Sequence, residues 1–328
     1  MASRFTCVQL LSESSDATVS FFVANIVYSK IRRHWNQLAA QEREQLTAFL
    51  QNLILKHITV TEEAKGGSEA ILSRLILCFV CCGALTPQGL LSYTSLALSL
   101  LQSEEGDSMK GRKEGVGLEM LAVLPEEVEA LDLSRPARLE LQQQLASVCV
   151  SVLTAIESVC RRGGGQGEGE TMVLRALRGW STSQGILTLS KLQTDLPHAW
   201  LTVASSFTLP SPVSSSSLAS NRAQRLKEAC HLMRDLIAIK EFPLSKDRVL
   251  ALKTLTAVLI APQTLSSMAM LFTRDNHDLL HEYNEVALDV CDFFVCLISS
   301  EMGLFSSEEG FQTDLFLLLL HSAACRPR

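Results

Sequence analysis

The chain has 328 residues, of which 47% are hydrophobic but only 6% aromatic, and its formal net charge at pH 7 is -6. Leu and Ala supply most of the apolar positions, a composition that favours helices packed on helices over sheets. A sequence pI of about 5.7 argues against a nucleic-acid-binding protein, which needs a basic surface to neutralise phosphates. An acidic surface suits basic protein partners instead.

The ten cysteines lie mostly within apolar stretches, as at Cys78, Cys81 and Cys82. Neighbouring cysteines on one helix cannot pair easily, so we expect reduced thiols in a protein of the nucleus and cytoplasm. Residues 1–9 do not resemble a secretory signal. Residues 75–103 and 254–273 carry no charge, but turn residues interrupt both stretches. We interpret them as buried helices and expect no membrane span.

Helical periodicity dominates the first half of the chain. The predicted elements are helices at residues 17–34, 41–58, 69–84 and 87–102, a loop at 103–115, a short helix at 116–124 stopped by Pro125, and a long helix at 137–161. In the first helix, the spacing predicts one buried face and one polar face. The residues expected to be buried are Phe22, Ile26, Ile31 and Trp35, and those expected on the polar face are Asn25, Ser29 and Arg32.

The second half continues with predicted helices at residues 171–180, 187–207, 221–240, 246–260, 277–301 and 307–324, and with a Ser/Pro-rich loop near 208–220. No segment shows the alternation typical of a strand. Helix pairs recur about every 40 to 50 residues, the period of HEAT and armadillo repeats. The predicted fold class is therefore all-α, an α-α superhelix, with a generic helical bundle as the alternative. We expect amino-terminal repeats over 1–102, the loop at 103–115 and further repeats over 116–328.

Two segments resemble a known family. An aromatic and Ala-bearing helix leads into a Lys-Ile pair, a Trp and a Leu-rich helix, at Phe22, Ala24, Lys30, Ile31, Trp35, Leu38 and Leu46. Residues 117–128 (GLEMLAVLPEEV) are similar to a Leu-Pro-Glu-Glu stretch of the same family, and Trp180 falls where its members have a helix that ends in Ser-Trp. This pattern resembles the amino-terminal part of importin-β (karyopherin-β) superfamily receptors, in the transportin-SR and importin-thirteen branch. Members of that branch are much longer, so the chain is expected to be incomplete.

The resemblance implies a nuclear transport receptor that works between nucleus and cytoplasm. Its implied partners are the GTPase Ran in its GTP form, protein cargo that includes Arg/Ser-rich proteins, and nucleoporins. The polar positions expected to contact Ran are Asn25, Ser29 and Arg32 on the first helix, and Glu69 and Ser73 on the helix expected to stack beside it. The alternative function is a HEAT-repeat scaffold that assembles a complex without Ran.

Candidates for chemistry are weak. His277 and His281 have zinc-ligand spacing, but Asp278 stands where a zincin needs Glu, and no third ligand is evident. Cys78 and Cys81 have CxxC spacing within an apolar helix, so buried small residues explain them better than a redox or zinc site. No phosphate-binding loop or catalytic arrangement stands out. We therefore expect no enzyme activity, metal or cofactor.

An acidic cluster follows Pro125. Its members are Glu126, Glu127, Glu129 and Asp132. A solvated helix end explains such a cluster without any ligand. The functional alternative is a patch for a basic partner.

Overall fold

The structure is a computed structural model, and all of its described elements are helical. It describes residues 10–12, 14, 16–59, 65–86, 89–103, 109–163, 168–184, 187–207, 216–239, 246–261, 264, 289–290, 292–293 and 295–297. No strand occurs within these ranges, and most of the described helices pack against one or more other helices. The fold is thus an all-α helical repeat, which confirms the predicted α-α superhelix class. The chain divides into two compact units, Met1–Ala155 and Ile156–Arg328.

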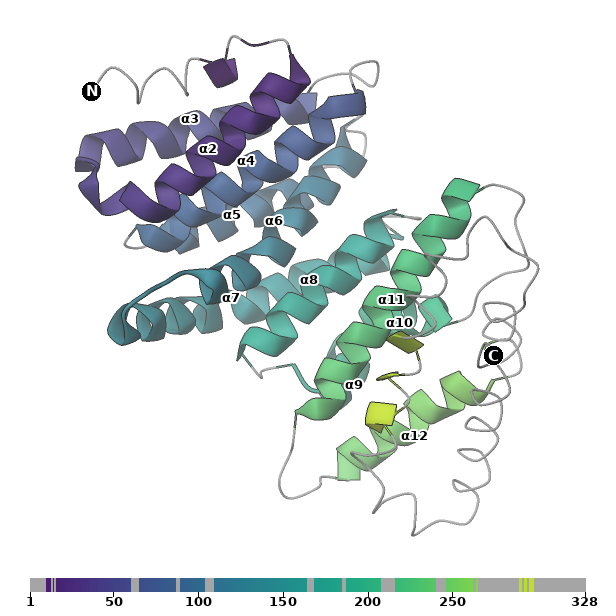
Figure 1. Cartoon of the computed structure of the whole chain (residues 1–328). Helices are drawn as coiled ribbons and strands as arrows, with labels where there is room; N and C mark the ends of the chain where they lie inside the picture. Colours follow the sequence, from purple (N-terminus) through teal and green to yellow (C-terminus); the bar gives the residue numbers. More distant parts are fainter. Residues whose placement is uncertain are drawn as a thin grey trace. The chain divides into compact units, whose positions relative to one another are not determined.

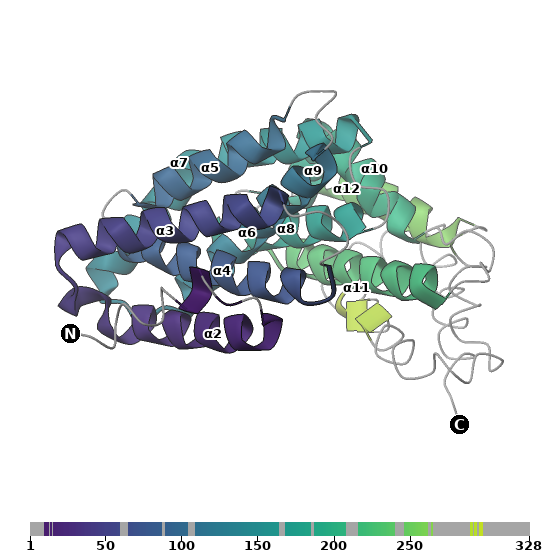
Figure 2. The same cartoon turned by 90° about the horizontal axis from the view of Figure 1, so that it is seen from above.

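Unit 1 is built around one central helix. Its elements are α2 (Ala17–His34), the 3-10 helix η1 (Trp35–Gln37), α3 (Ala40–Thr59), α4 (Lys65–Leu85), α5 (Gly89–Leu101), α6 (Lys110–Ala130) and the first part of α7 (Arg135–Arg161). Helix α4 packs against α2, α3, α5 and α6, while α2 packs mainly on α4 and so lies at an edge of the unit (Figures 1 and 2). A helix that is apolar on all sides belongs in such a central position. Accordingly, nearly every residue of α4 from Leu75 to Ala84 is buried.

Close backbone approaches at two glycines shape this packing. A Cβ on Gly89, the first residue of α5, would lie 2.6 Å from the carbonyl oxygen of Gly83, so the tight turn between α4 and α5 requires glycine there. A Cβ on Gly117 of α6 would lie 2.9 Å from the carbonyl oxygen of Ala97 on α5. The α4–α5 turn also agrees with the prediction that charge-free residues 75–103 form two helices. Of the second charge-free stretch, 254–273, residues 254–260 belong to α12, and most of the remainder lies outside the described residues.

The helices described in unit 2 are the end of α7 and α8 (Glu168–Gln184), α9 (Leu189–Asp195), α10 (Pro197–Phe207), α11 (Ser216–Ala238) and α12 (Lys246–Ile260). Helix α8 packs along α11, and α9 packs on α12 and α10 (Figure 1). Of the helices predicted at 277–301 and 307–324, only short helical pieces at 289–297 are described. Residues 208–215 of the predicted Ser/Pro-rich loop lie outside the described residues. Residues 216–220 belong to α11.

Charged side chains hold two helix ends in unit 2. The buried Glu157 carboxylate on α7 accepts backbone N–H bonds from His198 (3.1 Å) and Ala199 (2.9 Å) at the amino end of α10, where Pro197 begins the helix. The buried Arg248 guanidinium donates to the carbonyl of Ile237 (2.9 Å) at the carboxyl end of α11. Both charges have the sign that stabilises the helix dipole they face.

Several predicted boundaries were wrong. Helix α6 begins at Lys110, inside the predicted loop at 103–115, and runs through Pro125 to Ala130. Pro125 removes one helical hydrogen bond, but the flanking residues Leu124 and Val128 are buried and keep the segment helical. The single helix predicted at 187–207 is two helices that meet at Pro197, and α8 continues past Trp180 to Gln184.

One described helix, α7, is long and apolar enough to cross a membrane by length and composition alone. Core helices of soluble proteins pass the same test, so this is weak grounds for a span. Its buried residues, among them Leu141, Leu145, Cys149 and Val152, recur every three or four positions, as on an amphipathic helix.

Candidate functional site

Helix α2 carries three of the positions expected to contact a partner. The Asp16 carboxylate caps the amino end of the helix by accepting hydrogen bonds from the backbone N–H groups of Thr18 (2.8 Å) and Val19 (3.3 Å). Asn25 and Ser29 are half-buried and Arg32 is exposed. Ile31 and Trp35 are buried as predicted.

The prediction was wrong for Phe22 and Ile26, which are both exposed. The buried face of α2 consists of Ser20, Val23, Ala24, Val27 and Ile31. Phe22 and Ile26 have the same four-residue spacing as Val23 and Val27, so two apolar faces compete for the core. Periodicity alone does not choose between them.

A polar cluster joins α2 to α6. The hydroxyl of Tyr28 lies 2.8 and 3.0 Å from the two carboxylate oxygens of Glu127 and donates to that carboxylate. Arg32 donates to the Tyr28 oxygen (3.1 Å) and to the carbonyl of Ala130 at the end of α6. Burial, together with the hydrogen bond to Glu127, raises the pKa of Tyr28 from 10.0 to about 12. Residues 28, 32 and 127 are called the α2–α6 cluster below.

This cluster brings together residues that the sequence placed in separate sets. Arg32 was expected on a Ran-contacting face and Glu127 in an acidic patch, yet both bond within unit 1. Glu127 is half-buried, whereas Glu126, Glu129 and Asp132 are exposed. Glu127 is therefore a link between helices, and the open part of the acidic patch consists of the other three residues.

Helix α4 packs beside α2, as expected, and carries the two remaining positions. Glu69 is exposed and Ser73 is half-buried near the start of α4. The neighbouring Arg74 places its guanidinium over the ring of Phe21 on α2, 5.6 Å from the ring centre. Such a cation–π contact helps to fix α2 on α4.

The cysteines of α4 are buried, as the sequence indicated. Cys78, Cys81 and Cys82 are free thiols, and Cys81 donates to Glu127 at 3.4 Å. Burial raises the pKa of Cys78 to about 12 and that of Cys82 even further. Thiols in this state are poor nucleophiles and poor metal ligands. Within the described residues, no group of three His, Cys, Asp or Glu side chains could hold a metal ion, and His277 and His281 lie outside those residues.

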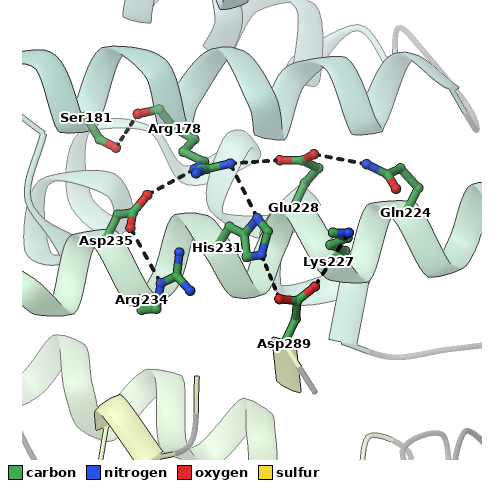
Figure 3. Close-up of polar contacts among 9 residues, drawn as sticks. All are labelled: Arg178, Ser181, Gln224, Lys227, Glu228, His231, Arg234, Asp235 and Asp289. Carbon is green, nitrogen blue, oxygen red and sulfur yellow. Dashed lines mark hydrogen bonds and ion pairs between the residues drawn. The ribbon is translucent and has the colours of Figure 1, made fainter. Parts of the chain in front are cut away.

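Unit 2 contains a polar network that the sequence analysis missed. Figure 3 shows Arg178 of α8 reaching three side chains of α11. Its guanidinium lies 3.0 Å from Asp235, 3.4 Å from Nδ1 of His231 and 3.7 Å from Glu228. A guanidinium only donates hydrogen bonds, so Nδ1 of His231 accepts and its Nε2–H donates to Asp289 at 3.0 Å.

The network fastens α8 to α11, and among the residues drawn in Figure 3 it presents no free nucleophile. The nearest hydroxyl drawn with it, that of Ser181, is buried and donates to the backbone carbonyl of Arg178 (Figure 3). No nucleophile is therefore presented to His231 by the residues drawn. The available sequence signal was the spacing of Glu228, His231 and Asp235, which places three polar side chains on one face of α11.

Comparison with known proteins adds no relative: no protein-family model matches the chain, and no curated protein matches it.

Proposed function

We propose that the chain is a nuclear transport receptor of the importin-β type, in which unit 1 binds Ran in its GTP form. One observation carries the proposal. The two segments that resemble the family lie in α2, η1 and α3 and in α6, and the Tyr28–Glu127 bond connects α2 to α6 directly. Segments 99 residues apart in sequence thus belong to one packed unit. This supports reading them as parts of a single receptor module.

The proposed Ran contacts are Asn25, Ser29 and Arg32 on α2 with Glu69 and Ser73 on α4. A helical repeat presents such side chains from neighbouring helices on one stacked surface, because each repeat contacts its neighbours. The proposed cargo is a basic protein, including Arg/Ser-rich ones, because the chain is acidic overall and exposes Glu126, Glu129 and Asp132. Nucleoporin binding and residence in both nucleus and cytoplasm follow from the same proposal.

Binding of the purified chain to Ran loaded with GTP or GDP tests the proposal. We expect selective binding to the GTP form, measured by isothermal titration calorimetry. Changing Asn25, Ser29 and Arg32 together to Ala should weaken this binding at least tenfold, about 1.4 kcal/mol.

Tyr28→Phe is the matched control. The triple change also removes the Arg32 bonds of the α2–α6 cluster, and Tyr28→Phe loosens the same cluster without altering the three proposed contacts. Equal weakening by both variants would mean that the cluster, and not the polar face, supports binding. Equal binding to both nucleotide forms, or no binding to either, would reject Ran recognition and favour the HEAT-repeat scaffold.

A further inference from the structure

The outer face of α2 carries a row of exposed apolar side chains. Val19 is 39% exposed, Phe22 62% and Ile26 46%. Their spacing of three and four residues puts them on one side of the helix, here called the α2 stripe. Single scattered exposed apolar residues are ordinary, whereas contiguous exposed apolar surface is the kind that proteins use to contact other molecules.

The stripe is held in place from below. The rings of Phe21 and Phe22 meet edge to face with their centres 6.1 Å apart. Phe21 in turn lies under the Arg74 guanidinium of α4. Phe22 therefore loses little side-chain freedom when a partner covers it, which favours binding.

Charge reverses along α2. Asp16 stands at its amino end, residues 17–29 carry no charge, and Lys30, Arg32 and Arg33 follow in the last turns. Asp16 and Arg33 lie 17 positions apart (33 − 16), which corresponds to roughly 25 Å along a helix. A helix that is negative at one end, apolar in the middle and positive at the other end is complementary to its own reverse.

We propose that the α2 stripe pairs with the α2 stripe of a second copy of this chain, antiparallel about a two-fold axis. In this register Phe22 lies opposite Ile26 of the other copy, and Asp16 lies opposite Arg33. Both pairs are centred near position 24, so one register satisfies the apolar and the charged contacts together. The two helix dipoles also oppose each other favourably. An acidic helix from another protein would match the basic end but leave Asp16 beside like charge.

The expected association is weak. A single helix pair buries less than the roughly 800 Å² per partner of a standard stable interface. We therefore expect a dissociation constant on the order of tens of micromolar. Ser29 follows Phe22 by seven residues on the same side of α2, so a second copy and Ran would compete for this face. The test below uses no Ran, so its outcome does not depend on the proposed receptor function.

Sedimentation velocity of the full chain tests the proposal over concentrations from roughly 5 to 500 micromolar. The wild type should shift from monomer to dimer across this range. Phe22→Asp should remain monomeric, because it places a charge in the centre of the apolar contact. Leu201→Asp is the matched control: Leu201 is also 62% exposed but lies on α10 of unit 2, so its change should leave the dimer intact.

A second variant tests the register. Arg33→Glu places a carboxylate opposite Asp16, so it should weaken dimerisation several-fold at low salt and much less at high salt. All variants must keep the circular dichroism of the wild type; if Phe22→Asp does not, Ile26→Asn replaces it. A wild type that stays monomeric at the highest concentration overturns the proposal. So does a dimer that survives the α2 changes, or one that Leu201→Asp disrupts equally.

Discussion

At the scale of single residues, Tyr28 shows how one hydroxyl can join distant segments. It donates to Glu127 and accepts from Arg32, so it ties a helix near the start of the chain to the end of α6. The sequence offered no sign of this contact. Tyr28 and Glu127 are 99 positions apart, and only the packing of α2 and α6 around α4 brings them together. By contrast, the burial of Trp35 followed directly from the helical pattern.

The raised pKa of Tyr28 predicts a loss of stability at alkaline pH. The folded chain holds the phenolic proton up to about pH 12, whereas the unfolded chain releases it near 10.0. The contribution of Tyr28 to stability is therefore complete below pH 10.0 and is lost as the pH rises through about 12. Ultraviolet absorbance of tyrosinate, followed against pH, measures this titration directly.

Two variants identify the titrating group. Tyr28→Phe should remove one alkaline step, and Glu127→Gln should move that step to lower pH, because it removes the carboxylate charge and replaces a charged acceptor with a neutral one. Burial remains in Glu127→Gln, so the pKa should not return fully to its ordinary value. A Tyr28 that titrates near 10.0 in the wild type would contradict the assignment.

At the scale of elements, α6 shows that tertiary packing can override the local sequence pattern. Its glycines, its charged start and Pro125 all suggested a loop and a short helix, yet it forms one helix of 21 residues. Contact with α5 and α4 supplies the difference. The predicted bounds of α2 and α12 are the same as those in the structure. These two helices lack such competing signals. Sequence patterns predicted the helices well and their ends poorly.

Two glycines of α6, two positions apart, make opposite predictions. A Cβ on Gly117 would press on the Ala97 carbonyl and on Leu101, whereas a Cβ on Gly115 meets nothing within 4 Å. Gly117→Ala should therefore lower the free energy of unfolding by about 1 to 3 kcal/mol through overpacking. Gly115→Ala should raise it by about 0.5 to 1 kcal/mol, because alanine favours a helix.

Urea denaturation followed by circular dichroism measures both changes. The pair shares one helix and one chemical substitution, so it separates the close approach of α5 and α6 from helix propensity. Equal effects of the two substitutions would show that Gly117 does not mark a close contact.

At the scale of the whole molecule, the chain holds two hydrophobic cores. Unit 1 buries Trp35, and unit 2 buries Trp180 and Trp200. The boundary between the two compact units falls within α7, a continuous helix with no break in its sequence pattern. Contacts between distant residues define these units, and a sequence read locally does not contain them.

Separate cores predict that a defect in one unit is felt mainly there. The chain has three tryptophans, and fluorotryptophan labelling gives each a fluorine NMR signal. In a urea titration, Gly117→Ala should move the Trp35 transition to lower urea and shift those of Trp180 and Trp200 less, because each core unfolds cooperatively. Equal shifts of all three signals would show that the chain unfolds as one cooperative body.

Because α4 is central in unit 1, the reactivity of its cysteines reports how often the surrounding helices open. Cys78, Cys81 and Cys82 are shielded by neighbouring helices and held as unreactive thiols. An alkylating reagent added to the native protein reaches them only during the moments when those helices part. The rate of alkylation of the α4 peptides, followed by mass spectrometry, therefore measures how often unit 1 opens locally. A ligand that stabilises unit 1 would lower this alkylation rate. Alkylation of the same three cysteines is therefore an assay for binding partners that does not require a partner to be known beforehand.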